Sequence, residues 1–250
     1  MRYSSRFWLY APITAFLTLA VAVAIHWWFA AGTFEKKLAA IKGHEAVPGV
    51  TLDWSKAEVG GFPFRIDAAF QNFSVRGMAA RGPFTWTSAE FALHTLTYGR
   101  RKTVYEAAGH QHLQWTLADG QAHSADFLPA TMHASSTIDA RGLARFDLDI
   151  VDAAGQGFTA ARLQAHMRRD PDGTDLDVMA RADDLKGFGA PAPLVEGYFT
   201  LGAPAPLMPL LAGKSSWPDA VRAWQNNGGR QHLTRGTRSD LAARILSGLF

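Results

Sequence analysis

The histidines His110 and His112 stand two residues apart in the segment GHQHLQW and come closest in this sequence to a metal-binding pair. Residues at i and i+2 of a β-strand point to the same face, so two imidazoles at this spacing can ligate one zinc ion. However, Gln114 and Thr116 share that face, which indicates the solvent side of an alternating strand. We therefore interpret the histidines as a surface pair, and we predict no metal and no other cofactor.

Asp147 and Asp149 form a second candidate, a carboxylate pair on the polar face of an alternating run. Acid–base catalysis by such a pair requires surroundings that separate the two pKa values, and the neighbouring sequence supplies no apolar enclosure. The run DPDGTDLD from residue 170 to 177 resembles a calcium loop, but its glycine comes too early, Pro171 interrupts it and no terminal glutamate follows. We expect solvated carboxylates at the first position and a tight turn at the second.

The sequence lacks the motifs of the commonest enzyme classes, since a G-x-S-x-G elbow, a P-loop, a dinucleotide fingerprint and HExxH are all absent. It contains no cysteine, which excludes disulfides, thiolate nucleophiles and cysteine-ligated metals. The basic cluster GRRKT at residues 99–103 has no interleaved aromatic residue, so we do not expect nucleic acid as a partner. Contact with lipid headgroups is the alternative there to a solvated turn. We predict that the protein is not an enzyme.

The segment from Phe7 to Gly32 carries no formal charge and is long enough to cross a membrane as a helix. At 1.5 Å per residue it spans roughly 39 Å, against roughly 30 Å for the hydrocarbon core of a bilayer. It ends in Trp27, Trp28 and Phe29, which is typical of an interfacial aromatic belt rather than of a signal-peptide cleavage site. We expect residues 7–32 to form an uncleaved transmembrane anchor; a cleaved signal or a buried core helix are the alternatives.

The orientation of this anchor does not follow from counting basic residues, because arginines before the segment are balanced by lysines after it. A very short basic N-terminus ahead of a single span usually stays in the cytoplasm. We therefore expect residues 1–6 in the cytoplasm and the rest of the chain outside it. Beyond the span, Phe34, Leu38 and Ile41 share one helical face, which predicts a helical stalk over residues 33–47.

After Pro48 the apolar period changes to two, beginning with Val50, Leu52 and Trp54 on one face. The stretch VGGFPFRI at residues 59–66 then forms a corner. Glycines permit positive φ, and proline fixes its own φ and favours extended geometry in the residue before it. We assign the corner to Gly60, Gly61 and Pro63 and expect a strand to begin there at a sheet edge or bulge. The apolar face of that strand is predicted to carry Phe62, Phe64, Ile66, Ala68 and Phe70.

The same one-sided alternation recurs along the rest of the chain, and DPDG joins two of the runs as a predicted hairpin. The only strong helix signal is SWPDAVRAWQNNGG, with Ser216 as N-cap, Pro218 in the first turn and Gly228 past the end. One short helix cannot cover so large an apolar face. Residues 48–250 are therefore predicted to be mainly β, a large antiparallel sheet that either closes as a sandwich or curves into a groove for an acyl chain. The apolar positions are Leu113, Trp115, Leu117, Met132, Ala134, Ile138, Phe146, Leu148, Ile150, Ala161, Leu163, Ala165, Met167, Leu176, Val178 and Ala180.

The segments WWFAAGTFEKKL and VTLDWSKAEVGGFPFRIDAAFQN resemble a bacterial family called domain of unknown function 2125. The resemblance is good from the anchor to about Phe73 and looser beyond. The GFPFR corner is also similar to AsmA-like envelope proteins, whose relatives form long β-sheet grooves that carry lipid. This resemblance implies a single-pass protein of the bacterial inner membrane with its bulk in the periplasm, and it supplies no catalytic residues. In similar proteins further strands follow the late helix, so we expect a truncated C-terminus with an uncovered sheet edge.

Two functions remain open at this stage. The first is a lipid-binding or lipid-handling module, in which the membrane and a phospholipid or other acyl-chain lipid are the partners. The second is a structural or scaffolding envelope protein that docks a protein partner through its sheet. For the first function, the residues predicted to line an apolar groove are Trp54, Phe62, Phe64, Ile66 and Phe70.

Overall fold

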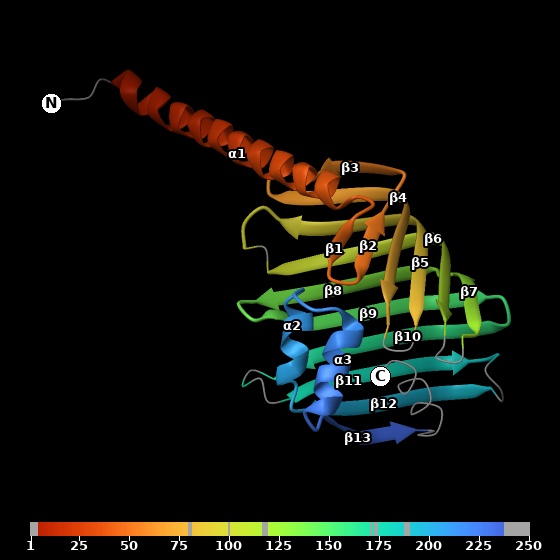
Figure 1. The fold of residues 1–250 in the computed structure, drawn as a ribbon. Coiled ribbons are helices and arrows are strands. Elements are labelled where there is room, and N and C mark those ends of the chain that lie inside the picture. The colour runs from red at the N-terminus through yellow and green to blue at the C-terminus, as the bar shows by residue number, and fades with distance from the viewer. Residues whose placement is uncertain are drawn as a thin grey trace.

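The computed structural model describes residues 5–79, 82–99, 101–116, 120–170, 172, 175–187 and 191–237. A long helix, α1, comes first, and strands make up most of the rest, as the alternation predicted (Figure 1). The elements are α1 (Ser5–Ile41), β1 (Glu45–Val47), β2 (Val50–Asp53), β3 (Lys56–Gly60), β4 (Arg65–Met78), β5 (Pro83–Leu96), β6 (Lys102–Thr116), β7 (Ala122–Leu128), β8 (Thr131–Asp139), β9 (Gly142–Gly155), β10 (Phe158–Arg169), β11 (Asp175–Leu185), β12 (Ala192–Gly202), η1 (Ala205–Leu207), α2 (Met208–Leu211), α3 (Trp217–Asn226) and β13 (Arg230–Thr237).

All the strands belong to one antiparallel sheet, whose main path runs β1-β2-β4-β5-β6-β7-β9-β10-β11-β12-β13. Two strands lie off this path, because β3 pairs with the first part of β4, and β8 lies between the first part of β6 and β9. The expected large antiparallel sheet is confirmed. The hairpin expected around DPDG is also present, since β10 pairs with β11, although residues 171, 173 and 174 of that connection lie outside the described residues.

The strands bend sharply along a line that crosses the sheet, and left-handed residues mark this line. Asn72, Gly109, Asp152 and Asp184 have φ of 50°, 71°, 51° and 49° on β4, β6, β9 and β11. Asparagine, aspartate and glycine are the residues that tolerate this conformation best. A left-handed residue shifts the alternation by one position, so that Phe70 and Phe73 of β4 are both buried although they are three residues apart.

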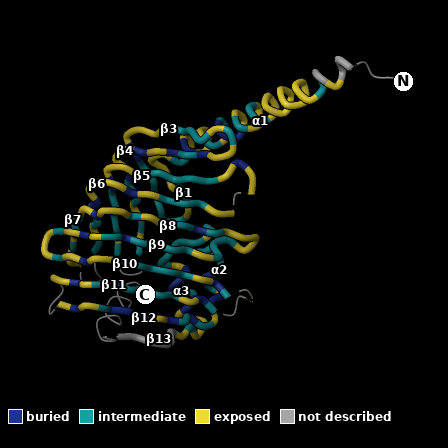
Figure 2. Tube along the Cα trace, turned by 180° about the vertical axis from the view of Figure 1, so that it is seen from behind, coloured by how far each residue is buried: buried dark blue, intermediate teal, exposed yellow. Residues whose placement is uncertain are grey.

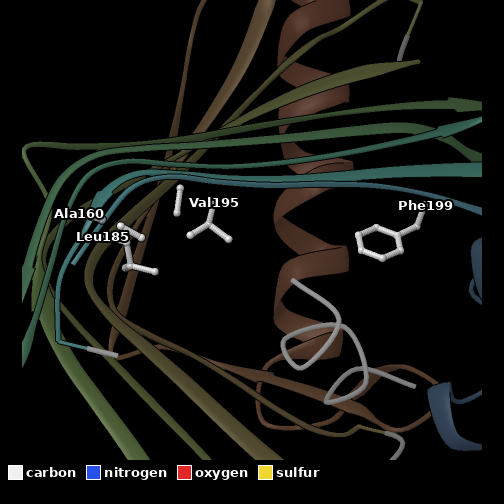
Figure 3. Close-up of a cluster of buried hydrophobic side chains, with 6 residues drawn as sticks. Ala160, Leu185, Val195 and Phe199 are labelled. Carbon is white, nitrogen blue, oxygen red and sulfur yellow. The ribbon is translucent and has the colours of Figure 1, made fainter. Parts of the chain in front are cut away.

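The bend divides the sheet into two arms. The long arm contains β3, β8, the first halves of β4, β6 and β9, and most of β10, β11 and β12. The short arm contains β1, β2, β7 and the second halves of β4 and β6, and Figure 1 shows it standing crosswise in front of the long arm. Figure 3 shows the bend itself, with Ala160 and Leu185 close to it and Val195 and Phe199 farther along the long arm. The chain therefore forms one bent sheet with an inner and an outer face.

The inner face is mainly apolar. Cross-strand neighbours place Ala68, Leu93, Tyr105, Ala134, Leu148, Ala165, Ala180 and Gly197 in one row from β4 to β12. The outer face carries ion pairs, among them Asp67–His94 at 2.7 Å, Arg145–Asp147 at 2.7 Å and Arg162–Asp149 at 2.6 Å. Seen from behind, the exposed residues concentrate on α1 and at the turns (Figure 2).

Helix α1 is continuous from the apolar segment into the domain, and its last turns pack on the inner face. Leu38 is buried in one cluster with Trp54 and Phe70, and Phe34 and Ile41 pack against the same cluster. The helical face predicted for the stalk is therefore the face that makes the contact. The predicted stalk is too long, because the helix ends at Ile41 and residues 45–47 form β1. Nor is it a free spacer, since the sheet buries Ala30, Ala31 and Leu38.

The late helix α3 has the predicted caps, since the Ser216 side chain accepts from Asp219 N and Gly228 has φ 74°. It covers one end of the inner face, where Trp224 is buried with Leu176 and Leu201. The Trp224 indole also donates to the Gly202 carbonyl at 2.9 Å. The short helix α2 was not predicted. Strand β13 follows α3 and pairs with β12, and the tail expected to be truncated, residues 238–250, lies outside the described residues.

The corner at residues 59–66 differs from the prediction in one respect. Gly61 has φ 96°, and a Cβ there would lie 2.8 Å from the Arg65 carbonyl oxygen, so this position requires glycine. Strand β4 begins only at Arg65, however, and Phe62 and Phe64 lie in the turn before it. Two further predicted inner positions also differ. Ile138 is exposed at the end of β8, and Ala161 is exposed because the bend gives its neighbour Ala160 the buried position.

Candidate ligand-binding cavity

A cavity of about 450 Å³ lies between the long and the short arm on the inner face. Trp86, Leu113 and Phe127 reach it from the short arm, and strands of the long arm supply the rest of the wall. A volume of this size falls within the range of small-molecule sites in proteins. The lining residues are Trp86, Phe91, Tyr105, Glu106, Ala107, Leu113, Phe127, Met132, Ala134, Phe146, Leu148 and Ile150.

Aromatic rings form the end of the cavity nearest to α1. Phe91 stacks on Phe73 with ring centroids 4.3 Å apart and meets Trp86 edge-on at 5.8 Å. Tyr105 stacks on the other side of Phe91 at 6.1 Å. Because these rings come from β4, β5 and β6 on both sides of the bend, the bend itself brings them together. Such contacts each contribute roughly 0.5–1.5 kcal/mol beyond the area that they bury.

Alanines leave the space that makes the cavity. Ala107 and Ala134 occupy adjacent strands of the long arm, with Met132 and Leu148 beside them. Small side chains at neighbouring positions of a sheet cannot reach across to the facing arm. A pocket lined by hydrocarbon favours an apolar occupant, because binding removes apolar surface from water.

Few polar atoms face this wall. The Trp86 indole Nε1 is buried without a hydrogen-bond partner among the described residues. The Tyr105 hydroxyl bonds to Ser136 Oγ at 2.9 Å, so its hydrogen-bonding capacity is partly used. Glu106 belongs to the outer face, where its half-exposed carboxylate lies 3.8 Å from His94 Nε2. The indole N–H is therefore a buried donor beside the cavity that lacks a partner among the described residues.

The residues predicted to line a groove lie elsewhere. Trp54, Ile66 and Phe70 are buried, and Trp54 and Phe70 belong to the filled cluster under α1. Phe62 and Phe64 lie outside the sheet and are 59% and 53% exposed. None of the five belongs to the wall of the cavity between the arms. The sequence identified the apolar face correctly, but which part of that face the helix α1 fills cannot be read from alternation.

Some lining residues were recognisable from the sequence. Leu113, Met132, Ala134, Phe146, Leu148 and Ile150 were among the predicted apolar strand positions. The sequence pattern did not predict Trp86, Phe91, Tyr105, Ala107 and Phe127 as lining residues. Trp86 and Phe91 lie on opposite sides of the bend in β5. Their side chains face the same way only because the alternation shifts between them.

The other chemical candidates lie on the outer face or at its turns. His112 Nδ1 pairs with Asp126 Oδ1, while His110 is exposed. In the part of the chain that the structure describes, no group of three or more His, Asp or Glu side chains is arranged to hold a metal ion. Of the basic cluster at 99–103, Arg101 and Lys102 are exposed at the start of β6, and residue 100 lies outside the description.

Asp147 and Asp149, which the sequence predicted to be solvated, are partly buried and held in ion pairs with Arg145 and Arg162. Burial acts to raise the pKa of Asp147, but hydrogen bonds from Arg145 and His166 outweigh it and leave this pKa below its ordinary value. The hydrogen bond from Arg162 lowers the pKa of Asp149 in the same way. Both groups are therefore ionised at neutral pH, so neither can act as the proton donor of an acid–base pair.

The chain matches the model of a known family. The model of a bacterial family described as "uncharacterized protein conserved in bacteria (DUF2125)" matches residues 27–248, and the chain belongs to this family, as its resemblance predicted. No curated protein and no solved structure matches the chain. The similarity to AsmA-like envelope proteins stays a prediction.

Proposed function

We propose that this DUF2125 protein is a non-enzymatic, membrane-anchored module that binds the acyl chain of a lipid between the two arms of its sheet. The observation that supports the proposal most directly is the cavity of about 450 Å³, whose wall is almost entirely hydrocarbon. Each methylene group that moves from water into such a wall contributes roughly 0.8 kcal/mol. A polar ligand would instead lose its hydrogen bonds to water without replacement.

The membrane anchor favours a lipid over other apolar molecules as the ligand. Helix α1 is long and apolar enough to cross a membrane, and its apolar window is almost wholly exposed. A domain held at a bilayer is surrounded by acyl chains at high local concentration. With residues 1–6 in the cytoplasm, the domain lies in the periplasm, on the outer side of the bacterial inner membrane.

The composition of the wall supports a binding role rather than catalysis. Among the described lining residues there is no histidine, aspartate, serine, threonine or lysine. The ion-paired carboxylates of β9 lie on the opposite face of the sheet. A nucleophile with an adjacent base, the usual requirement of covalent catalysis, is therefore not assembled by these residues.

The test is to purify the full chain in a detergent whose mass is distinct from any lipid, extract it with organic solvent and measure lipids by mass spectrometry. A single-span protein purified in the same way is the control. We expect about one lipid per chain in excess of the control. A well-folded protein with no excess lipid would contradict the proposal and would favour the scaffolding function.

A further inference from the structure

Large apolar side chains are exposed together at one edge of the long arm. Phe62, Phe64 and Tyr98 are 59%, 53% and 60% exposed, and Leu96 and Ile138 are 39% and 46% exposed. A contiguous exposed patch of this kind in a folded protein usually marks an interaction site. We call this group, together with the exposed basic residues Arg101 and Lys102, the apolar edge.

Backbone hydrogen bonds hold the segments of the apolar edge side by side. The Phe64 carbonyl accepts from the backbone N and the hydroxyl of Thr97 at 3.0 and 3.1 Å. Farther along, Ile138 N donates to the Arg101 carbonyl at 2.7 Å. Turns that are distant in the sequence therefore present their apolar side chains along one continuous line.

The apolar edge is joined to α1 where the helix leaves the domain. The Trp27 ring meets the Phe62 ring edge-on at 5.6 Å, and the Trp27 indole donates to the Arg65 carbonyl at 2.7 Å. Directly after this point Ala30 and Ala31 are buried against the domain, whereas Trp28 and Phe29 are 69% and 64% exposed. Trp27 thus marks the boundary between the packed and the exposed part of the helix.

The length of the exposed helix fits a bilayer that begins at this boundary. From Tyr10 to Trp27 the helix rises by roughly 26 Å at 1.5 Å per residue, close to the roughly 30 Å of a hydrocarbon core. Tryptophan, tyrosine and phenylalanine concentrate at the border between hydrocarbon and headgroups, and lysine and arginine reach the headgroups themselves. The apolar edge has both kinds of side chain, and its Phe62 lies beside Trp27 of α1.

We propose that the apolar edge lies on the outer surface of the bilayer that α1 crosses, with its aromatic and aliphatic side chains in the interfacial layer and Arg101 and Lys102 at lipid phosphates. This inference rests on the membrane anchoring of the proposed function, but not on lipid binding in the cavity. The Trp27–Phe62 contact and the Arg65 hydrogen bond fix the domain against the membrane rather than letting it swing on a tether. The opposite ends of the strands, at Met78 and Leu128, then point away from the bilayer.

The absence of cysteine from the sequence makes a site-by-site test direct. The full chain is reconstituted into vesicles of phosphatidylethanolamine and phosphatidylglycerol after single substitutions Phe62→Cys, Tyr98→Cys or Ile138→Cys and labelling with a nitroxide. For each label, the rate at which the nitroxide collides with oxygen, which concentrates in the bilayer, is compared with the rate at which it collides with a water-soluble nickel chelate. The matched controls are Met78→Cys and Leu128→Cys, which are 46% and 47% exposed at the far edge.

We expect nickel collision at the three edge positions to be at least threefold lower than at the two controls, with oxygen collision higher. Equal nickel collision at all five positions would overturn the inference. Leu19→Cys, in the exposed part of α1, separates two failures. If a label at residue 19 lies in hydrocarbon while the edge labels stay in water, only the apolar edge is wrong. If residue 19 itself is in water, the anchoring of the proposed function fails as well.

Discussion

The Trp86 and Phe91 rings meet edge-on across the bend of β5, with centroids 5.8 Å apart and planes inclined by 86°. Trp86 belongs to the short arm and Phe91 to the long arm, so this contact joins the two walls of the cavity. The register on either side of Ala89 shifts, which turns both rings to the inner face. The shape of the cavity is therefore set by the same backbone feature that divides the sheet into arms.

Filling the cavity should displace its ligand. Ala134→Phe adds a ring where an alanine lines the wall, and we expect the amount of co-purified lipid to fall at least fivefold. The matched control is Ala69→Phe, which places the same ring at an exposed position of β4. Mass spectrometry of organic extracts from equal amounts of the two variants measures the effect. Equal lipid in both variants, with circular dichroism showing both folded, would place the ligand outside this cavity.

The Trp86 indole should recognise an oxygen atom of the ligand. Trp86→Phe keeps an aromatic ring but removes the buried N–H that has no partner among the described residues. We expect binding of a fatty acid or ester to weaken about fivefold, the equivalent of roughly 1 kcal/mol for one hydrogen bond. Binding of a hydrocarbon probe that lacks oxygen should stay unchanged. Fluorescence displacement titrations with the two probes make the comparison, and equal weakening for both would show that only packing was lost.

The sequence predicted the elements of this fold better than their curvature. Apolar alternation located the strands and the inner face, and the Ser216 cap located α3, because both patterns depend on neighbouring residues alone. The bend depends on single residues with positive φ, such as Asn72 and Asp152. Asparagine and aspartate also occur in strands and turns where φ is negative. Nothing in their local sequence distinguishes a left-handed asparagine from an extended one.

The candidate site was harder to predict for a related reason. Trp54 and Phe70 are large aromatic residues on the apolar face, as expected for a ligand groove, but α1 packs on them and fills that part of the inner face. The cavity lies instead where Ala107 and Ala134 face the short arm. Whether an apolar position is filled or hollow depends on which distant segment faces it. Alternation carries no such information.

The bend should be sensitive to residues that resist positive φ. Asn72 has φ 50° and is exposed, so a substitution there tests the backbone rather than the core. We expect Asn72→Val to lower the free energy of unfolding by about 1–2 kcal/mol, because branched side chains are strained in this conformation. Asn72→Gly relieves the strain and should cost less, although it loses the hydrogen bond to Ser55 Oγ at 3.1 Å.

Gln71→Val provides the matched control for this substitution. Gln71 is the exposed neighbour in the regular part of β4, where valine is a good strand former. Its effect should stay within about 0.5 kcal/mol. Urea unfolding followed by circular dichroism measures all three variants, and equal destabilisation by the two valines would show that the conformation of Asn72 does not hold the bend.

The outer face should make the protein sensitive to acid. Burial acts to raise the pKa of Asp67, but hydrogen bonds from His94 and Arg65 outweigh it and leave this pKa below its ordinary value. Hydrogen bonds from Arg145 and His166 lower the pKa of Asp147 in the same manner. A carboxylate whose pKa is lower in the folded than in the unfolded state stabilises the fold fully above its unfolded value of about 3.9. This contribution is lost as the pH falls through the folded value. We therefore expect the melting temperature to decrease steeply below about pH 4.

Asp147→Asn isolates one of these contributions. The amide cannot be protonated in this range, so the variant should be less stable than the natural protein at pH 7, by roughly 0.2–1 kcal/mol for a partly exposed ion pair. The difference should begin to shrink below about pH 4 and should vanish only once the pH has fallen below the lowered pKa of Asp147 in the folded state. Arg145→Gln should reproduce the same trend, because it removes the partner 2.7 Å away. If the difference between the natural protein and Asp147→Asn stayed constant from pH 7 to pH 3, the ion pair would not contribute to stability through its charge.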